Sequence, residues 1–167
     1  EMFGQFTEGM NRLGKVTRDR GFKLCYHHHM GTGCQTMEET DRFLAATDHE
    51  LVWLLYDSGH FAFSGSDPVA MVDRSIARIG HVHLKDIRPE IHRQVVREKL
   101  SFLDAVRAGV FTVPGDGSID FPSIFRVLEH AGYEGWMVVE AEQDPAKADP
   151  LEYAQKARRY IAKHIGL

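Results

Sequence analysis

Leu51-Val-Trp-Leu-Leu-Tyr-Asp57-Ser-Gly-His60 is the stretch that decides the fold of this 167-residue chain. An unbroken apolar run ends abruptly in a carboxylate, and an imidazole follows three positions later. Such a run is typical of a central strand of a parallel sheet, because that strand is buried on both faces. In parallel α/β folds the chemistry collects where strands end and loops begin. Asp57 is therefore a candidate ligand, although Asp-Ser-Gly is also ordinary turn chemistry.

Composition and charge exclude several classes of protein. With 43% hydrophobic and 26% charged residues, the chain is an ordinary globular one that can bury one core. A formal net charge of −4 gives no general attraction to nucleic acid or anionic lipid. No apolar run approaches the ~20 residues of a membrane span, and two cysteines are too few for a disulfide framework. We therefore expect a cytoplasmic protein without nucleic acid or membrane as partner.

Helix and strand signals alternate along the chain. Four short apolar segments predict strands, at 22–26, 51–56, 81–84 and 136–139. Helix start signals precede several of the intervening segments, at Thr36, Asp67, Asp120 and Asp149. The long interruption at 86–111 is expected to contain two helices. We further expect Gly80 to end the helix before the third strand, and Trp53 and Trp136 to lie in the core.

The order of these elements predicts an α/β fold with parallel strands joined by right-handed crossovers. A (β/α)8 TIM barrel usually needs ~250 residues, and four strands make half of one. We therefore expect residues 1–167 to be the C-terminal half of a single TIM-barrel domain, with the last four strands and their helices; an open four-stranded sheet is the alternative. Because a half-barrel exposes two edges and an apolar inner face, we expect a homo-oligomer or a missing N-terminal half to cover it.

Each predicted strand delivers imidazoles or carboxylates at its carboxyl end. In chain order these groups and their neighbours are His27, His28, His29, Asp57, His60, His81, His83, Lys85, Asp86, Glu140 and Glu142. Imidazoles and carboxylates that converge without thiolates favour manganese, cobalt, zinc or magnesium. Because side chains alternate along a strand, His81 and His83 share one face, and we expect the later one to be the ligand. The same parity pairs Glu140 with Glu142, and we expect the first of these to bind.

Five segments also resemble the inosose dehydratases, a family within the xylose isomerase-like TIM barrels. They are Tyr26-His-His-His-Met-Gly-Thr32, Tyr56-Asp-Ser-Gly-His60, His81-Val-His-Leu-Lys-Asp86, Phe111-Thr-Val-Pro-Gly-Asp-Gly-Ser-Ile-Asp-Phe121 and Tyr133-Glu-Gly-Trp-Met-Val-Val-Glu-Ala-Glu-Gln-Asp-Pro145. The resemblance covers nearly the whole chain. His-Val-His-Leu-Lys-Asp recurs across the superfamily and identifies only the fold. The histidine triplet and the Trp-Met-Val-Val-Glu-Ala-Glu-Gln-Asp-Pro run are more specific to the dehydratases.

The resemblance implies a metal site and assigns residues to it. The superfamily usually binds its metal through Glu, Asp, His and Glu on the last four barrel strands, and Asp57, His83 and Glu140 match the last three positions. The first position falls near His27, where related sugar epimerases carry a glutamate. The alternatives for this fourth ligand are His29, Gln35 and water. The implied ion is Mn²⁺ or Co²⁺, with Zn²⁺ or Mg²⁺ as alternatives, and the family leaves a need for glutathione open.

The resemblance also implies a reaction, the dehydration of 2-keto-myo-inositol (scyllo-inosose) to a trihydroxycyclohexane-dione in inositol catabolism. In this chemistry a metal stabilises the enolate, a base takes the α-proton, and an acid protonates the departing hydroxyl. We expect His60, ahead of the metal-bound Glu140, to be the base, and Lys85 or a loop histidine to be the acid. The predicted substrate contacts are His27, His29, His60, Lys85 and Arg88.

Two other functions remain open at this point. One is a sugar isomerase or epimerase of the same superfamily, which uses the same enolate but returns the proton. The histidine-rich loop at 27–29, where epimerases tend to carry glutamate, favours the lyase. The other is an inactive half-barrel that binds metal or only packs against itself.

Overall fold

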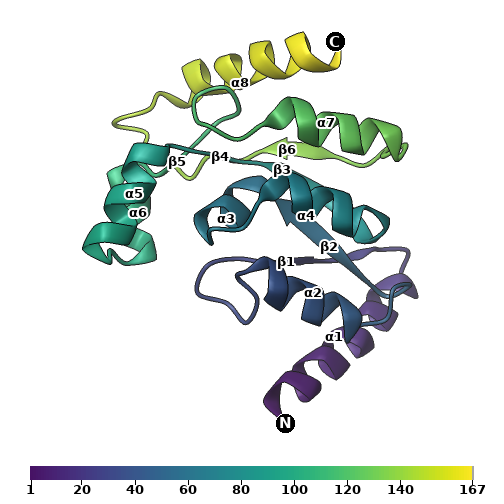
Figure 1. The fold of residues 1–167 in the computed structure, drawn as a ribbon. Coiled ribbons are helices and arrows are strands. Elements are labelled where there is room, and N and C mark those ends of the chain that lie inside the picture. The colour runs from purple at the N-terminus through teal and green to yellow at the C-terminus, as the bar shows by residue number, and fades with distance from the viewer. Residues whose placement is uncertain (167) are drawn as a thin grey trace.

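Helices and parallel strands alternate along residues 1–166, the part of the chain that the computed structural model describes (Figure 1). The main sheet has four parallel strands in the order β1 (Leu24–His27), β2 (Val52–Asp57), β3 (Ile79–Leu84) and β6 (Met137–Val139). Each strand of this sheet pairs with the next one along the order, and helices form the connections. The predicted α/β fold with parallel strands is thereby confirmed.

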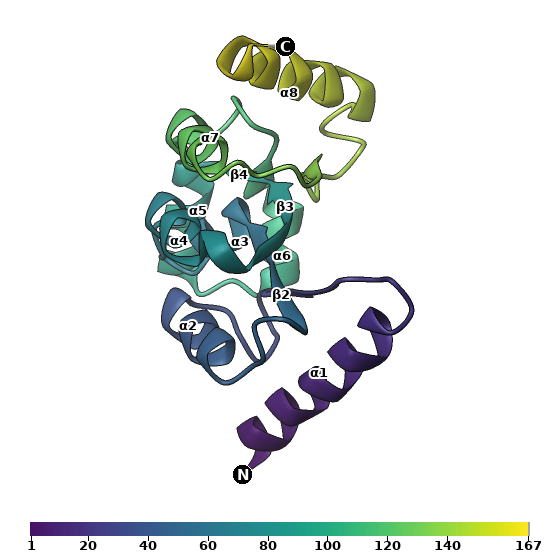
Figure 2. The ribbon, with the colours of Figure 1, turned by 90° about the vertical axis from the view of Figure 1, so that its right-hand side faces the viewer.

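Helices cover one face of the sheet and leave the other without a helix (Figures 1 and 2). The covering helices are α2 (Met37–Ala45), α4 (Pro68–Ser75) and α7 (Phe121–His130). Two longer helices, α1 (Met2–Arg18) and α8 (Pro150–Ile165), lie beyond the β1 and β6 edges of the sheet. Among the described helices, none combines the length and the apolar character that a membrane crossing requires.

The core lies between these helices and the strand residues that point toward them. On β2 the inward residues are Val52, Leu54 and Tyr56, which are fully buried. The alternate residues Trp53 and Leu55 point to the helix-free face and are only partly buried. This face combines the apolar Trp53 and Leu55 with the imidazoles of His81 and His83 on β3. The expectation that a second copy or further chain covers it is not tested by the fold.

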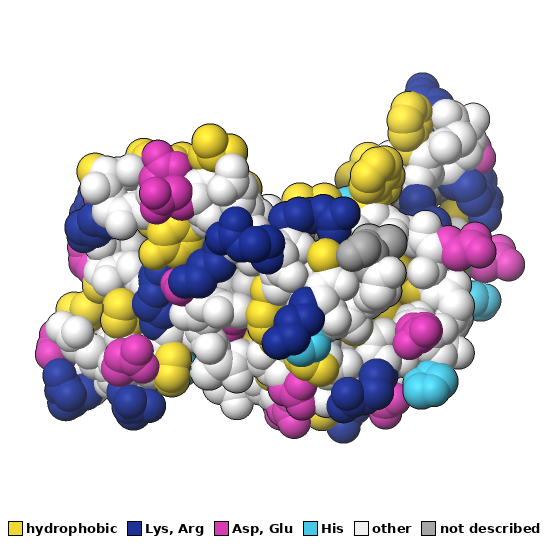
Figure 3. Space-filling model, turned by 90° about the horizontal axis from the view of Figure 1, so that it is seen from above, with side chains coloured by type: hydrophobic (Ala, Val, Ile, Leu, Met, Phe, Trp, Pro, Cys, Tyr) yellow, Lys and Arg dark blue, Asp and Glu magenta, His cyan; other side chains and the backbone are white. Residues whose placement is uncertain are grey.

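The β6 edge of the molecule combines a basic surface with an apolar groove. Basic side chains are visible on the face of the molecule that carries α8 (Figure 3), and this helix contains Lys156, Arg158, Arg159 and Lys163. Between α8 and the edge strand β6 lies a groove of about 570 Å³, whose apolar lining includes Met137, Val139 and Ile161. An edge strand lacks a neighbour on one side, so a groove beside it is expected.

A second, smaller layer adjoins the carboxyl end of β3. There β4 (Asp86–Ile87) pairs antiparallel with β5 (Phe111–Thr112), and α5 (Pro89–Glu98) and α6 (Phe102–Ala108) lie between them in the chain. The sequence predicts the two helices. It does not predict the antiparallel pair, because two-residue strands carry no periodicity.

The loop at 113–119 wraps around one buried carboxylate. Asp86 accepts hydrogen bonds from the backbone N–H groups of Gly115, Gly117, Ser118 and Ile119. A Cβ at Gly117 would overlap the Asp86 side chain, so glycine is required there. These contacts fix the loop that follows β5 to the first residue of β4.

Local signals place the helix starts correctly. Thr36 forms a complete capping box with Glu39 at the start of α2. The side chains of the other three predicted caps also accept hydrogen bonds from the first turn of their helices, at Asp67, Asp120 and Asp149. Such caps are local, since the side chain and its backbone donors lie within three residues of each other.

Three predictions about single residues are wrong. Trp53, expected in the core, points to the helix-free face and belongs to neither core cluster of the described residues. Gly80 does not end a helix: α4 stops at Ser75, the 3₁₀ turn η1 (Ile76–Arg78) follows, and Gly80 lies inside β3. A Cβ there would stand 2.8 Å from Cys25 Sγ, so a close approach of strands is what demands glycine. Trp136 is 79% exposed because it precedes an edge strand, where hydrophobicity alone does not imply burial.

We predict opposite effects of two glycine-to-alanine changes in α1. At Gly14 a Cβ would stand 2.5 Å from the Leu51 carbonyl oxygen, whereas at Gly9 nothing lies within 4 Å. Gly14→Ala should lower the free energy of unfolding by about 1–3 kcal/mol through overpacking. Gly9→Ala should raise it by about 0.5–1 kcal/mol through better helix propensity. Urea unfolding measures both, and equal shifts would contradict the close packing of α1 on Leu51.

Candidate metal centre

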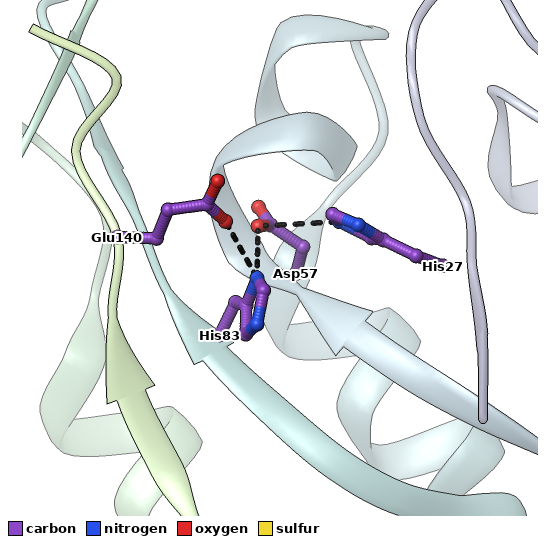
Figure 4. Close-up of side chains that lie close together, drawn as sticks. All are labelled: His27, Asp57, His83 and Glu140. Carbon is purple, nitrogen blue, oxygen red and sulfur yellow. Dashed lines mark ion pairs between the residues drawn. The ribbon is translucent and has the colours of Figure 1, made fainter.

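Four ligand-type side chains meet at the carboxyl ends of the four parallel strands (Figure 4). They are His27 at the end of β1, Asp57 at the end of β2, His83 near the end of β3 and Glu140 directly after β6. Strand pairing explains their meeting, since Asp57 and His83 are register partners. One donor atom of each residue lies within 4.8 Å of the others. The structure therefore brings together the four residues that the sequence nominated as ligands.

The donor atoms approach one another without forming hydrogen bonds. His83 Nδ1 lies 2.5 Å from Glu140 Oε2 and 3.4 Å from Asp57 Oδ2, and His27 Nε2 lies 3.6 Å from the same Asp57 oxygen. All four atoms are buried and have no hydrogen-bond partner among the described residues. Because buried polar atoms are nearly always satisfied, four of them that converge fit a cation bound between them. Two imidazoles and two carboxylates suit a divalent transition metal.

The two carboxylate oxygens of Asp57 make different contacts. Oδ1 accepts a hydrogen bond of 2.9 Å from the backbone N–H of His60 and caps α3 (Ser58–Phe63), while Oδ2 faces the two imidazoles. The sequence predicts a turn here, but the cap starts a short helix instead. Burial alone would raise the pKa of Asp57, yet His27, His83 and the Lys85 ammonium hold it well below its usual value. Asp57 is therefore ionised, as a ligand must be.

Charge pairing sets the protonation of His83. Burial alone would lower the pKa of this imidazole, but the carboxylates of Asp57 and Glu140 raise it to about 9. Contact with His83 in turn lowers the pKa of Glu140. In the metal-free site a proton on His83 therefore takes the place of the cation. A metal ion has to displace this proton, because only neutral imidazole coordinates.

His28 supports the centre from behind and is not one of its ligands. Its buried ring stacks on Phe61 with centroids 3.5 Å apart, and its Nε2 accepts from the backbone N–H of Asp57 at 3.4 Å. Burial lowers the pKa of His28 to about 3, so the ring stays neutral. The sequence His27-His28-His29 alone does not reveal this role. Which of these side chains points to the site depends on where β1 ends, and the sequence does not fix that residue.

A second polar group lies beside the four ligands. Donor atoms of His29, His60 and Glu142 lie within 4.8 Å of one another. The fully buried Lys85 lies among them, with Nζ 2.6 Å from Glu142 Oε2 and 3.0 Å from His60 Nε2. The same Nζ lies 3.5 Å from Glu140 Oε2 and 3.7 Å from Asp57 Oδ2, two of the candidate ligand atoms. Lys85 therefore joins the second group to the first.

The residues that follow Asp57 create the space for Lys85. Ser58 Oγ donates to the Lys85 carbonyl at 2.7 Å and accepts from its N–H at 3.1 Å. A Cβ at Gly59 would overlap the Lys85 stem, so only glycine fits. On the far side Phe111 places its ring centre 4.9 Å from Nζ. Asp57-Ser-Gly-His60 thus forms one unit that holds the lysine.

Glu142 is the site residue that sequence reasoning ranked too low. Its φ of +42° lies in the left-handed region, which a non-glycine residue rarely adopts. This backbone turns the carboxylate to Lys85 and to within 3.7 Å of His60 Nε2. Strained residues of this kind cluster at functional sites. No local pattern in the sequence indicates a left-handed glutamate.

Other predicted residues lie outside this arrangement. The guanidinium of Arg88 binds two carbonyls within 109–111 and the carboxylate of Asp116, so its contacts support the β4–β5 layer. Substrate binding by Arg88 remains a prediction that these contacts do not favour. Gln35 bonds within its own loop. His81 lies beside the ligand of its strand with ring centroids 5.3 Å apart, in keeping with a packing role.

In this chain, imidazoles and carboxylates lie together at the carboxyl ends of parallel strands. This arrangement is that of an α/β-barrel protein with a site suited to a metal ion. The family model of the xylose isomerase-like TIM barrel matches residues 1–164. The chain belongs to this family.

Two curated relatives carry the same name. The chain is 57% identical over 167 residues to inosose dehydratase of Clostridium botulinum (strain Alaska E43 / Type E3), which covers 100% of this chain and 56% of that protein. It is 59% identical over 160 residues to inosose dehydratase of Geobacillus thermodenitrificans (strain NG80-2), with coverages of 96% and 54%. The chain thus spans about half the length of the curated relatives it matches.

Solved structures share the fold at low sequence identity. The probable 3-DHS dehydratase AsbF of Bacillus anthracis, involved in petrobactin synthesis, matches with a TM-score of 0.70 and 19% identity over 93% of this chain and 56% of that chain. The IolI protein with a binding zinc atom matches with a TM-score of 0.71 and 18% identity over 96% and 56%. At these identities the two structures support the fold alone.

Replacement of Asp57 should remove the metal without removing the helix cap. Asp57→Asn keeps an oxygen for the N–H of His60 but loses the charge, so metal affinity should fall by at least ~100-fold. Calorimetry with Mn²⁺ or Zn²⁺ and elemental analysis measure the loss. Asp104→Asn, at an exposed acid on α6, is the matched control and should bind normally. Full occupancy in Asp57→Asn would contradict the assignment.

Metal uptake should release a proton from His83. Its pKa of about 9 means that the ring is protonated at pH 7 and neutral in the metal-bound site. Binding at pH 7 should therefore release about one proton, and affinity should rise about tenfold per pH unit up to about pH 9. Calorimetry in buffers of different ionisation enthalpy counts the proton. Heats that do not depend on the buffer would refute this linkage.

The raised pKa of His83 also predicts how the stability of the metal-free fold depends on pH. The folded pKa of about 9 lies above the ordinary value of 6.5, so the protonated ring stabilises the fold. This contribution is complete below pH 6.5 and is lost as pH rises through 9. The melting temperature of the metal-free protein should fall across this window. In His83→Gln the fall should be smaller, because the variant lacks this titrating ring. A rise of the melting temperature in the parent would contradict it.

Proposed function

We propose that this chain carries the metal centre and catalytic groups of an inosose dehydratase, a hydro-lyase that removes water from 2-keto-myo-inositol. The observation that supports it most is the group of four candidate ligands with the contacts of Lys85 to Glu142 and His60 beside it. Elimination of water from a ketone needs a Lewis acid, a base and a proton donor in one place. The name carried by the relatives at 57% and 59% identity agrees with this combination.

The proposal includes the ion and the setting. The ion is Mn²⁺ or Co²⁺, with Zn²⁺ and Mg²⁺ as alternatives; the IolI protein, which shares the fold, has zinc. When bound, it supplies Lewis-acid polarisation of a carbonyl. We place the four strands as the C-terminal half of one barrel domain, in a cytoplasmic enzyme whose open face is covered by a second copy or by further chain. A glutathione requirement remains a family expectation.

His29 is better placed than His60 to take the α-proton. Nδ1 of His29 contacts the Met30 carbonyl at 2.8 Å, and because a carbonyl only accepts, this nitrogen carries the hydrogen and Nε2 keeps its lone pair. His29 is partly exposed, whereas His60 is fully buried with Nε2 turned to Lys85. Burial also lowers the pKa of His60 to about 2, which makes it a poor proton acceptor.

Lys85 is the proposed source of the proton for the departing hydroxyl. Its ammonium is fully buried, while the Glu142 carboxylate that it contacts at 2.6 Å has a side chain 27% exposed. We therefore assign the last transfer to Glu142, the partly exposed partner of the buried lysine. His60 holds the ammonium from the other side through Nε2.

The reaction is tested with 2-keto-myo-inositol and the longest natural chain that contains these residues. Formation of the dione, followed by its ultraviolet absorbance, is expected in the presence of Mn²⁺ or Co²⁺. Exchange of the α-hydrogen with solvent deuterium without formation of the dione would indicate an epimerase instead. If a metal-loaded protein shows neither exchange of the α-hydrogen nor formation of the dione, the proposal is overturned.

His29→Gln should separate proton abstraction from metal binding. The variant should keep its metal but lose about 10²–10⁴-fold in kcat, the usual contribution of a general base. His49→Gln, at an exposed histidine in the turn before β2, is the control and should leave kcat unchanged. Unchanged turnover in His29→Gln would return the role to His60 or Glu140, and loss of metal would make His29 a ligand.

A further inference from the structure

We infer that the Lys85 ammonium fills a second cation position beside the metal centre, one that would otherwise bind a second divalent ion. His60 and Glu142 contact the ammonium, and together with His29 they form a group of metal ligands by type whose donor atoms lie within 4.8 Å of one another. The inference rests on the metal centre of the proposed function and does not depend on the reaction.

Two members of this group direct lone pairs at the ammonium. Lysine only donates, so His60 Nε2, 3.0 Å from Nζ, accepts from it, as does Glu142 Oε2 at 2.6 Å. The third member, His29, keeps a lone pair on Nε2 because its Nδ1 is engaged with the Met30 carbonyl. Two imidazole nitrogens and a carboxylate oxygen form a set that binds Mn²⁺, Co²⁺ or Zn²⁺ elsewhere.

The second position shares carboxylates with the first. Nζ lies 3.5 Å from Glu140 Oε2 and 3.7 Å from Asp57 Oδ2, the same two atoms that face the metal centre. Carboxylates between two neighbouring cations are the arrangement of two-metal sites, whose ions stand about 3.5–4 Å apart. The chain therefore has the framework of a two-cation site, with one cation attached covalently through a side chain.

Charge explains why the ammonium suffices. The two shared carboxylates and Glu142 carry three formal negative charges, which one divalent ion and one ammonium balance. A buried site with balanced charge avoids the cost of uncompensated ions. Loss of the ammonium leaves a negative charge at a ready set of ligands, and a second metal ion is the cation that fits them. Lys85 thereby keeps the centre at one ion per chain.

The test counts the ions bound by each variant. Titration with Mn²⁺ should give one ion per wild-type chain and two per chain of Lys85→Met, which keeps a long apolar stem but has no charge. Addition of Glu142→Gln to Lys85→Met should return the count to one. Lys163→Met, at an exposed lysine near the end of α8, should bind one ion. Elemental analysis gives the count, and electron paramagnetic resonance shows whether two Mn²⁺ ions are magnetically coupled.

The outcomes separate this inference from the metal centre itself. One ion in a folded Lys85→Met chain would overturn the inference, and so would two ions in the wild type. No ion in the wild type would overturn the metal centre of the proposed function. Lys85→Gln repeats the count in a second variant, and circular dichroism establishes that each variant is folded.

Discussion

The buried carboxylate of Asp57 is the constraint on which the rest of the site depends. An ionised carboxylate without solvent is costly unless each oxygen has a partner. One oxygen is satisfied by the first turn of α3, which fixes where His60 stands. The other lies between imidazoles and the Lys85 ammonium, and it requires a positive charge nearby. A single residue at the end of β2 therefore determines both the course of the chain and the sign of the charge that the site attracts.

Three kinds of cation are available to this group of carboxylates, and they differ in how they leave. The proton on His83 leaves as pH rises, a metal ion leaves by dissociation, and the ammonium of Lys85 stays with the chain. A proton in the metal-free site stabilises the fold but competes with the metal for the same position. The ammonium lies 3.5 and 3.7 Å from the two carboxylates and stays with the chain whether or not a metal is bound. The proton on His83 thus links stability without metal to affinity for metal, whereas the charge of Lys85 is constant.

Most of the fold and the convergence of the four candidate ligands could be predicted because they depend on short-range patterns. Strand alternation identifies His83 rather than His81, and residue type alone identifies caps such as Asp67. The remainder depends on neighbours distant in sequence. Gly80 resembles a helix stop until the approach of Cys25 is known, and Trp136 resembles a core residue until its strand is known to be an edge. The choice of His29 over His60 as base likewise needs the Met30 carbonyl and the position of Lys85, neither of which periodicity contains.

The left-handed backbone of Glu142 also bears on how such a protein changes under selection. A side chain in this conformation costs roughly 1–2 kcal/mol relative to glycine. Glycine at this position would remove that cost, but it would also leave the buried ammonium of Lys85 without its 2.6 Å partner. Selection at position 142 therefore acts on the ion pair and on the backbone together.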